Sequence, residues 1–440
     1  MLVAASSKEP FTAKIEGLSH DGRGIARVEG KVWFIEGALP GETVKVKPIR
    51  GKRKYSLGIA EQILENSPDR VDPRCSAFGV CGGCVLQHLS YPQQLAFKKA
   101  TVVETLRGFA VEPPTEIMEI NSDPWSYRRR ARLGVRFVPK KGGVLVGFRE
   151  RHKSFVTPLM TCPVVHESVD RVLPKLPEFV ARLSAPDRIP QIEVAAGENG
   201  TALVFRHLTA LTDDDLSLLR RFEAEQGLVI YTQAKGPETV TPITGESVSD
   251  LSYTLKSSKV KVRFSATSFI QVNGEINERI VELIADWLRP GDQENVLDLF
   301  CGLGNFSLAL AGRSNRVVGI EGDQVLVDQA RINAKENNIN NVTFEVRDLY
   351  GESLADWQPE YFSRVLVDPP RSGALDILNV LKIKMKPQGI AYVSCNPATF
   401  ARDAAYLIGS GEYRLEKLAV ADMFPHTSHI ETCALFIRSD

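Results

Sequence analysis

The N-terminal part of the chain alternates apolar and polar residues over short stretches. Between residues 11 and 65, runs rich in Val, Ile and Phe are interrupted at Ser19–Gly24, at Gly30 and at Pro40–Gly41. Alternation with a period of two is typical of strands with one buried face, and several such strands with Gly-rich turns are typical of a small β-barrel. The pattern therefore predicts an OB-like β-barrel at the N-terminus.

From about residue 266 the pattern changes to helices that alternate with apolar strands. The expected helices are 273–288, 305–312 and 324–338, and the expected strands are 295–300, 316–322, 342–348, 364–370 and 389–395. Such alternation indicates a doubly wound α/β domain with a mostly parallel sheet.

The stretch between these parts is a mixture of both patterns. A helix is expected over 93–107, and a strand over 127–137. For a chain of 440 residues, two or three domains are the usual number. We therefore expect a barrel domain over 1–70, a mixed α+β domain over 71–265 and the α/β domain over 266–440.

Composition places the chain among ordinary globular proteins, with hydrophobic residues at 43% and charged residues at 25%. The N-terminus lacks a signal-peptide pattern, and no apolar run approaches the ~18 residues that a membrane span needs. Seven cysteines at uneven spacing do not suggest a disulfide framework. We expect a cytoplasmic monomer with no membrane partner.

The net charge of zero divides unevenly along the chain. Residues 266–440 hold 16 Lys+Arg and 24 Asp+Glu, a net of −8, so residues 1–265 carry +8. Basic residues gather in "KVKPIRGKRK" (45–54) and in "YRRRARLGVRF" (127–137). Both stretches suit contact with a nucleic-acid backbone. A solvated charged face is the alternative in each case.

The stretch "VLDLFCGLGNFSLAL" predicts a strand, a Gly-rich turn and a helix. Gly302 and Gly304 allow the backbone to approach a ligand closely. Ser307 stands where the dinucleotide fingerprint requires Gly or Ala. Asp298, before the turn, suits a cationic or hydroxylated ligand better than a pyrophosphate. Cys301, inside the turn, is interpreted as a packing residue.

Two further strands end in acidic residues. Glu321 is placed to hold ribose hydroxyls, and Asp348 to reach an adenine amino group. Together with the Gly-rich turn, these motifs look like the S-adenosylmethionine site of class I methyltransferases.

Cys395 ends an apolar strand directly before Asn-Pro, in "YVSCNPATFARD". Because the carboxyl ends of parallel strands form the binding crevice of such a sheet, Cys395 should face the cofactor. Glu431 stands between a polar turn and an apolar strand. A thiol and a carboxylate beside a methyl donor suit methylation of a pyrimidine at C5, where a thiolate adds to C6 and a base removes the C5 proton. A buried thiol and a surface carboxylate are the simpler alternatives.

The motifs "FSATSFIQVN", "DLFCGLGNFS", "LVDPPRSG", "YVSCNPATFARD" and "HIETCALF", over residues 264–436, resemble the RNA uracil-C5 methyltransferases. The resemblance implies Cys395 as nucleophile and Glu431 as general base. It implies contacts with S-adenosylmethionine or substrate from Gln271, Phe300, Gly302, Asn305, Glu321, Asp348 and Asp368. Asp368 would orient the uracil base near Cys395, and Phe269 would pack against the substrate. Cytosine-C5 enzymes, the near competitor, carry a cysteine inside the Asp-Pro-Pro-like motif, which "DPPRSG" lacks.

"CSAFGVCGGC" places three cysteines close together, and a fourth lies in "TCPVV". The expected ligands of a [4Fe–4S] cluster are Cys75, Cys81, Cys84 and Cys162, the last followed by Pro. Zinc held by the first three cysteines and His88 is the alternative. Some members of the family carry such a cluster, which favours iron–sulfur.

"GLSHDGRGIAR" and "ALPGETVKV" resemble the TRAM domain of RNA-modifying enzymes. A TRAM domain, the cysteine cluster and the chain length together resemble the branch that acts on 23S rRNA. The resemblance implies 23S rRNA, before full ribosome assembly, as the partner; a different rRNA or tRNA uridine is the alternative. Two other classes of protein are alternatives. The first is a non-catalytic RNA-binding module with an iron–sulfur sensor, which the presence of Cys395 and Glu431 opposes. The second is a redox or NAD enzyme, which Ser307 opposes.

Overall fold

A computed structural model of the chain describes residues 9–244, 251–354, 356–409 and 411–439. The chain divides into two compact units. Unit 1 consists of Met1–Thr101, Arg149–Thr157 and Phe424–Ser428, and unit 2 of Val102–Phe148, Pro158–Met423 and His429–Asp440. Helix α1 (Tyr91–Gly108) and strand β10 (Val156–Pro158) lie where the chain passes from one unit to the other.

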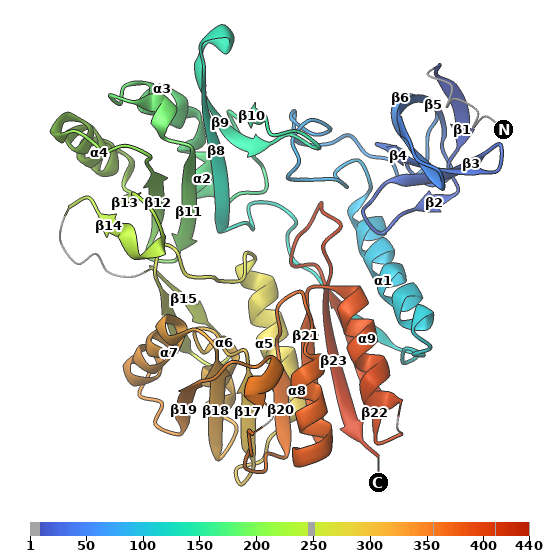
Figure 1. The fold of residues 1–440 in the computed structure, drawn as a ribbon, viewed down its shortest axis with the longest axis vertical. Coiled ribbons are helices and arrows are strands. Elements are labelled where there is room, and N and C mark those ends of the chain that lie inside the picture. The colour runs from blue at the N-terminus through green and yellow to red at the C-terminus, as the bar shows by residue number, and fades with distance from the viewer. Residues whose placement is uncertain (1–8, 245–250, 355, 410, 440) are drawn as a thin grey trace. The chain divides into compact units, whose positions relative to one another are not determined.

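Unit 1 contains a six-stranded sheet that curls into a small barrel (Figure 1). Its strands, in the order β1-β5-β6-β4-β3-β2, are β1 (Phe11–Lys14), β2 (Gly17–Leu18), β3 (Gly24–Val28), β4 (Lys31–Glu36), β5 (Thr43–Gly51) and β6 (Tyr55–Glu65). The Glu16 backbone N–H donates to the Ile25 carbonyl over 2.8 Å, which links the chain after β1 to β3. Trp33 and Ile35 lie in the apolar interior. The barrel that the alternating pattern predicts is therefore present.

The first sheet of unit 2 is built mainly from antiparallel strands. Its strands run in the order β9-β8-β11-β12-β13-β14, with bounds β8 (Arg130–Val138), β9 (Gly143–Arg149), β11 (Gln191–Gly197), β12 (Gly200–Arg206), β13 (Val229–Gln233) and β14 (Val240–Pro242). Three helices accompany them: α2 (Glu167–Asp170), α3 (Leu176–Ala181) and α4 (Asp213–Gln226). A separate hairpin, β15 (Leu251–Leu255) and β16 (Val260–Phe264), follows.

The largest sheet of unit 2 has eight strands. Its order is β19-β18-β17-β20-β21-β23-β22-β7, with bounds β17 (Asn295–Leu299), β18 (Arg316–Glu321), β19 (Val342–Val346), β20 (Arg364–Val367), β21 (Gly389–Ser394), β22 (Tyr413–Ala421), β23 (Glu431–Arg438) and β7 (Ile117–Ile120). The five strands from β19 to β21 are parallel, as predicted. β23 runs antiparallel to both β21 and β22. β7, which precedes residue 266, was not predicted as a strand of this sheet. The domain boundaries expected from the sequence stay a prediction.

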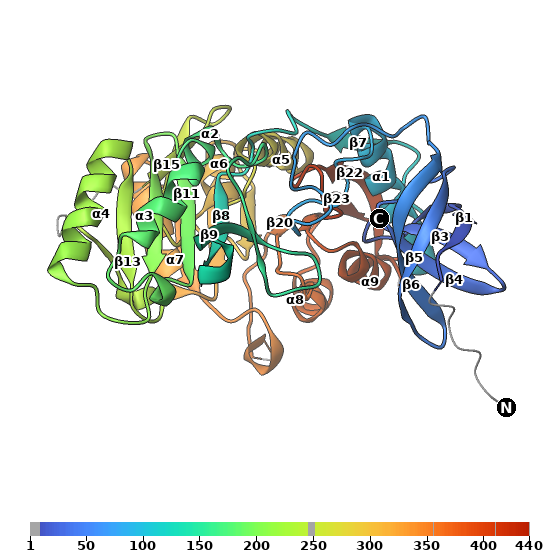
Figure 2. The ribbon, with the colours of Figure 1, turned by 90° about the horizontal axis from the view of Figure 1, so that it is seen from above.

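Helices cover both faces of this sheet. They are α5 (Gly274–Leu288), α6 (Asn305–Ala311), α7 (Gln324–Glu336), α8 (Leu375–Val380) and α9 (Pro397–Ile408). Phe400 of α9 and Ile377 of α8 share one buried core with Leu299 and Val367 of the strands. Figure 2 shows α5 on the opposite side of the sheet from α8 and α9. Within the described residues, no helix is both long and apolar enough to cross a membrane.

Short helical turns complete the structure. They are η1 (Pro139–Lys141), η2 (Leu173–Lys175), η3 (Pro186–Arg188), η4 (Pro237–Thr239), η5 (Gly351–Leu354) and the π-helical η6 (Leu381–Met385), which continues α8.

The barrel yields a first prediction, because β5 and β6 approach closely at Gly58. A Cβ added there would lie 2.5 Å from Val46 Cγ1, a distance that real side chains do not reach. Gly58→Ala should destabilise the barrel by about 1–3 kcal/mol, the usual cost of overpacking. Thermal unfolding of the purified protein measures the effect. Gly17→Ala is the matched control, since no atom lies within 4 Å of a Cβ there. Equal melting temperatures for the two variants would contradict the prediction.

Candidate active site

The Gly-rich turn after β17 holds an unusual backbone conformation. Phe300 has a φ of 65° and Gly304 a φ of 85°. A Cβ at Gly304 would also lie 3.1 Å from the Phe344 ring, so a side chain there would be both strained and crowded. A left-handed φ at a bulky residue is costly and often marks a functional site. Strain at Phe300 therefore agrees with the ligand-binding turn that the sequence predicts.

Glu321, at the end of β18, is fixed across this turn. Its Oε2 accepts from the Gly302 N–H at 3.1 Å, and its Oε1 accepts from the N–H groups of Gly322 and Asp323 at 2.7 and 3.2 Å. These three bonds hold the carboxylate in one orientation beside the turn. A fixed carboxylate of this kind is suited to accept hydrogen bonds from a ligand's hydroxyl groups.

Asp298 is a fully buried acid on β17. The Ser307 hydroxyl donates to its Oδ2, so the serine that breaks the dinucleotide fingerprint has a defined task here. Oδ1 has no hydrogen-bond partner among the described residues. Burial raises the pKa of Asp298 to about 7. A buried acceptor without a partner fits a ligand that brings a positive charge or a donor.

The remaining predicted cofactor residues surround the same turn. The Asn305 amide pairs with Asn277 at 2.9 and 3.0 Å and accepts from the Tyr253 hydroxyl at 2.8 Å. The Phe300 ring lies 5.6 Å from the Tyr350 ring, measured between centroids. Asp348 accepts from the Tyr350 backbone N–H at 3.0 Å.

Cys395 follows β21 directly and is half-buried. Asn396 then caps helix α9, with its side chain accepting from the Ala398 N–H. Burial raises the pKa of the Cys395 thiol, and the Glu431 carboxyl adds to the rise. Arg371 opposes it through its positive charge. Arg371 therefore stabilises the thiolate form of Cys395, whereas burial and Glu431 favour the thiol.

Glu431 begins β23, the strand that pairs with β21. The antiparallel register places Ser394 opposite Thr432, so the next positions, Cys395 and Glu431, meet at the same edge. Glu431 is 4% exposed. Burial raises its pKa well above the usual range, the nearby Asp368 adds to the rise, and Arg371 opposes it. A thiol and a desolvated carboxyl therefore lie side by side at the sheet edge.

Asp368 follows β20 and completes a group of acids at this edge. Burial raises its pKa to about 7, and the charges of Asp298 and Glu321 contribute. Carboxyl groups that share one water-poor site cannot all ionise at neutral pH. The structure thus brings Asp298, Glu321, Asp368 and Glu431 together with Cys395, five residues singled out in the sequence.

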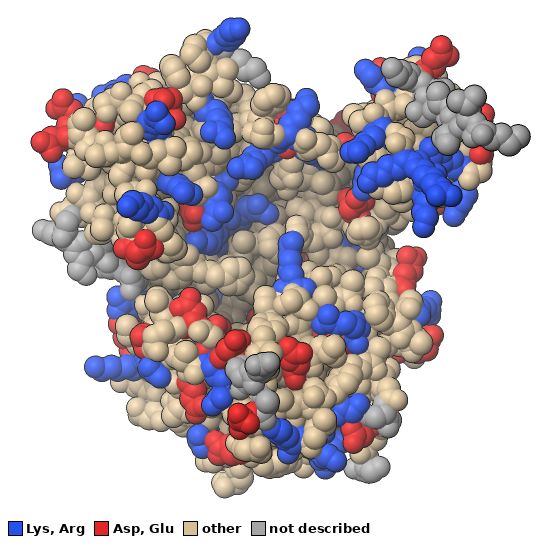
Figure 3. All heavy atoms as spheres, in the orientation of Figure 1, with Lys and Arg blue, Asp and Glu red and all other residues tan. Residues whose placement is uncertain are grey.

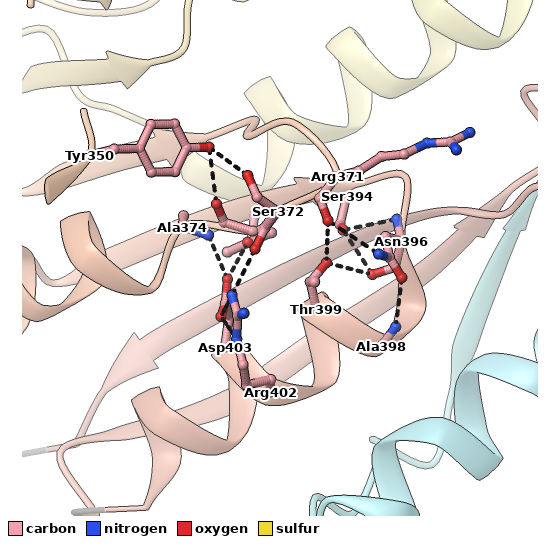
Figure 4. A network of polar contacts seen from close by, with 12 residues as sticks. Tyr350, Arg371, Ser372, Ala374, Ser394, Asn396, Ala398, Thr399, Arg402 and Asp403 are labelled. Carbon is pink, nitrogen blue, oxygen red and sulfur yellow. Dashed lines mark hydrogen bonds and ion pairs between the residues drawn. The ribbon is translucent and has the colours of Figure 1, made fainter. Parts of the chain in front are cut away.

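A hydrogen-bond network fixes the loop that carries Arg371 (Figure 4). The Arg371 carbonyl accepts from Asn396 Nδ2 at 3.1 Å and from the Thr399 hydroxyl at 3.2 Å. The guanidinium extends away from both side chains in the close-up view. The backbone thus makes the loop contacts, while the side chain contacts His429, with Arg371 Nη2 and His429 Nδ1 3.1 Å apart.

Asp403 of α9 anchors the next part of the same loop. This buried carboxylate accepts from the Ala374 N–H and from the Tyr392 hydroxyl, each at 2.7 Å, and pairs with Arg402. Gly373 has a φ of 81°, and a Cβ there would lie 2.6 Å from Asp403 Oδ2. The sequence did not reveal the roles of Arg371 and Asp403. Arg371 stands inside the quoted "DPPRSG" motif, which was the one available signal.

Two residues singled out in "FSATSFIQVN", Phe269 and Gln271, lie on the loop between β16 and α5. Phe269 is 70% exposed, as a side chain that meets a partner would be. The Gln271 carbonyl accepts from Arg129 Nε at 2.8 Å. Of the arginines expected to form a basic face, Arg129 is buried, whereas Arg132 and Arg136 are exposed.

The cysteines of the expected cluster fall into both units. Cys75, Cys81 and Cys84 belong to unit 1, Cys162 belongs to unit 2, and all are free thiols. In the parts of the chain that the structure describes, no group of three or more His, Cys, Asp or Glu side chains is arranged to hold a metal ion. His88 is buried with a pKa lowered to about 4 by burial.

Comparison with known proteins agrees with this geometry. Residues 90–439 match the family described as tRNA (Uracil-5-)-methyltransferase, and residues 9–60 match the TRAM domain. The 23S rRNA (uracil(1939)-C(5))-methyltransferase RlmD of Nitrosococcus oceani is 49% identical over 434 residues, covering 98% of this chain and 96% of the relative. The enzyme of the same description from Methylococcus capsulatus is 46% identical, covering 98% and 97%.

A solved structure extends the likeness to the fold. The Pyrococcus abyssi tRNA (uracil-54, C5)-methyltransferase, in complex with S-adenosyl-L-homocysteine, has a TM-score of 0.75 at 25% identity, covering 97% of this chain and 100% of that one. The parallel sheet with its strand-end turn and acids defines a Rossmann-like, S-adenosylmethionine-dependent methyltransferase. More narrowly, the chain belongs to the RNA uracil-C5 methyltransferase family, with an N-terminal TRAM domain.

The positive charge of Arg371 generates a second prediction. Arg371→Met removes a charge that favours the Cys395 thiolate, so the pKa of Cys395 should rise. The rate of alkylation of the Cys395-containing peptide as a function of pH, followed by mass spectrometry, reports the midpoint. Arg316→Met, at the start of β18, removes the same charge elsewhere and should leave the midpoint in place. An unchanged midpoint in Arg371→Met would show that the guanidinium does not act on the thiol.

Proposed function

We propose that the protein methylates C5 of a uridine in 23S rRNA, with S-adenosylmethionine as the methyl donor. The observation that carries the proposal is the pairing of β21 with β23, which brings Cys395 and Glu431 to one edge beside the Gly-rich turn. The relatives named for 23S rRNA support the substrate, because they share 49% and 46% of their residues with this chain over nearly its whole length.

Cys395 is the proposed nucleophile. C5 of uracil is a poor nucleophile, and addition of a thiolate to C6 turns the ring into an enolate with electron density at C5. The thiol first loses its proton to solvent, and the positive charge of Arg371 stabilises the resulting thiolate. The new S–C6 bond therefore prepares C5 to accept a methyl group.

Glu431 is the proposed general base. After methylation, C5 carries both the methyl group and its original hydrogen. Glu431 takes that proton, the ring regains its double bond, and the S–C6 bond breaks to release the thiolate. A carboxyl whose pKa is raised by burial is a stronger base once ionised than an ordinary surface carboxylate. Asp368, the acid beside it, is proposed to orient the uracil ring through a hydrogen bond.

S-adenosylmethionine supplies the electrophilic methyl group when it is bound. The residues proposed to hold it or the substrate are Gln271, Phe300, Gly302, Asn305, Glu321, Asp348 and Asp368. The fixed Glu321 carboxylate and the buried Asp298 oxygen without a partner among the described residues both fit a ligand with hydroxyl groups and positive charge. The solved relative was obtained in complex with S-adenosyl-L-homocysteine, which supports the same choice.

The basic barrel is proposed to bind RNA through its backbone. Six basic residues of β5 and of the turn between β5 and β6 are exposed: Lys45, Lys47, Arg50, Lys52, Arg53 and Lys54. Figure 3 shows Lys and Arg gathered on the face of the barrel toward the viewer. A uridine must leave its stack before a thiol can reach C6. We therefore propose rRNA that is not yet fully assembled as the substrate.

The substrate assignment has a direct test. Total RNA from cells that lack the gene is incubated with the protein and S-adenosylmethionine labelled in the methyl group, and the label is mapped by digestion and mass spectrometry. We expect 5-methyluridine at one position of 23S rRNA. Label in tRNA alone would favour the activity named for the Pyrococcus abyssi relative. No label in any RNA would refute the proposed function.

Glu431→Gln yields the third prediction. The amide keeps the shape of the side chain but cannot accept a proton, so thiolate addition and methylation remain possible while release fails. Enzyme and methylated RNA should accumulate as a covalent adduct through Cys395. A shifted band in a denaturing gel, dependent on S-adenosylmethionine, measures it.

Two further variants interpret that result. Cys395→Ala should abolish methylation while S-adenosylmethionine still binds, and the double variant with Glu431→Gln should form no adduct. Normal turnover in Glu431→Gln would assign the base to another residue. If Glu431→Gln is inactive and forms no adduct, Glu431 acts earlier, in substrate binding or in the addition step.

We propose further that Cys75, Cys81, Cys84 and Cys162 hold a [4Fe–4S] cluster. The Gly83 N–H donates to Cys81 Sγ at 3.4 Å, a kind of contact that tunes cluster thiolates. The largely buried Arg151 guanidinium lies close enough to Cys81 and Cys84 to interact electrostatically, and its Nε has no acceptor among the described residues. A buried cation with an unused donor beside two thiols fits an anionic group at this loop.

Metal analysis supplies the fourth prediction. Protein purified without oxygen should be brown and contain about four iron and four sulfide per chain, as the formula requires. Cys81→Ser or Cys162→Ser should remove the colour and weaken RNA binding or folding more than S-adenosylmethionine affinity. Stoichiometric zinc without iron would instead favour the site with His88. Protein without bound metal would refute both assignments.

A further inference from the structure

Two adjacent arginines at the start of β8 point inward instead of presenting a basic face. Arg130 Nη1 and Nη2 donate to the carbonyls of Ala266 and Thr267, each at 2.8 Å. The Arg130 side chain is only 18% exposed, whereas that of Arg132, two residues further along the same strand face, is 68% exposed. The two residues therefore have different tasks despite their shared sequence context.

Arg129 contacts the same loop from the other side of the strand. Its Nε donates to the Gln271 carbonyl at 2.8 Å, and its backbone N–H donates to the Val272 carbonyl at 3.0 Å. The guanidinium lies 4.3 Å from the centroid of the Tyr253 ring. Arg129 thus binds the end of the loop where Arg130 binds its beginning.

The loop held in this way, residues 265–272, carries Phe269, proposed to pack against the substrate, and Gln271, proposed to contact S-adenosylmethionine or the substrate. Phe269 is 70% exposed, and Gln271 follows two residues later. Within the loop, Ser268 Oγ and Ser265 Oγ lie 2.8 Å apart. Beyond these serine contacts, the two arginines connect the loop to β8. An aromatic ring exposed on a loop is useful only if the loop places it reproducibly.

The energetics favour a permanent tether over a phosphate contact. Removing a guanidinium from water is costly unless its donors are satisfied, and backbone carbonyls satisfy those of Arg130. A phosphate could replace them only by breaking two bonds to the loop. The exposed Arg132 instead pairs with Glu193 at 3.0 Å and, among the described residues, donates to no backbone carbonyl of the loop.

We propose that Arg130, assisted by Arg129, is a positioning residue for methyl transfer: it fixes the loop that presents Phe269 and Gln271 to the flipped base, while Arg132 contacts the RNA backbone. The inference rests on the proposed methylation of RNA. The proposal gives two arginines of β8 different roles: Arg130 affects the rate of methyl transfer, and Arg132 affects the affinity for RNA.

The fifth prediction compares Arg130→Gln with Arg132→Gln. Each substitution removes one charge from β8 and one partner from Glu193, so the pair is matched. Arg130→Gln should lower the single-turnover methylation rate at saturating 23S rRNA by about tenfold or more, as misplacement of substrate contacts does. Its binding should keep the wild-type salt dependence. Arg132→Gln should weaken binding to 23S rRNA and make the slope of log K against log salt shallower by about 0.7–0.9.

A conservative variant separates charge from geometry. Arg130→Lys keeps the charge, but its single ammonium cannot reproduce the planar fork that bridges two carbonyls. The tether therefore predicts a slow Arg130→Lys enzyme with normal salt dependence. Wild-type rate in Arg130→Lys, or a shallower salt slope in Arg130→Gln, would overturn the proposal and assign Arg130 to the RNA backbone.

Hydrogen exchange of the free protein tests the tether without any RNA. Backbone amides of residues 265–272 should exchange faster in Arg130→Gln than in the wild type, and at the wild-type rate in Arg132→Gln. Melting temperature checks that both variants are folded. If the wild type methylates no RNA, the proposed function fails, yet this exchange measurement still decides whether Arg130 holds the loop. Unchanged exchange in Arg130→Gln would refute the tether.

Discussion

The burial of several acids at one end of a sheet is the constraint on which the rest of the site depends. Asp298, Asp368 and Glu431 lie in a water-poor edge of one sheet, and burial raises the pKa of each. Such a group is stable only if protons, donors or cations offset its charge. Ser307 supplies a donor to Asp298, and Arg371 supplies a cation to Glu431 and Cys395. Asp298 Oδ1, which has no hydrogen-bond partner among the described residues, therefore favours binding of a positively charged ligand at this edge.

The parts of the site that follow single strands could be predicted from the sequence. Each acid or thiol stands directly after an apolar run, and the carboxyl ends of parallel strands meet at one edge whatever the details of packing. The motifs around Gly302, Glu321 and Cys395 are local in this sense. The Gly-rich turn, the parallel sheet and the grouping of these side chains were therefore accessible without coordinates.

Contacts between distant segments were not accessible in the same way. The alternating pattern at 127–137 correctly predicts a strand, but it cannot say which arginine a loop 136 residues away will cover. The same limit applies to Tyr253, which bonds Asn305 from a separate hairpin, and to β7, whose four residues carry too little pattern to reveal their partner. Cysteine spacing likewise indicates a cluster without fixing the arrangement of the thiols.

The position of β23 in its sheet has a consequence for biosynthesis. β23 lies between β21 and β22, and both of these strands leave the ribosome before it. Until it arrives, β21 and β22 expose unpaired edges, and such edges invite association with other chains. The same strand begins with Glu431, so a nascent chain that stops short of it already carries the thiol but lacks the carboxylate assigned to product release. Completion of this sheet and completion of the proposed catalytic pair are thus a single event, the docking of β23.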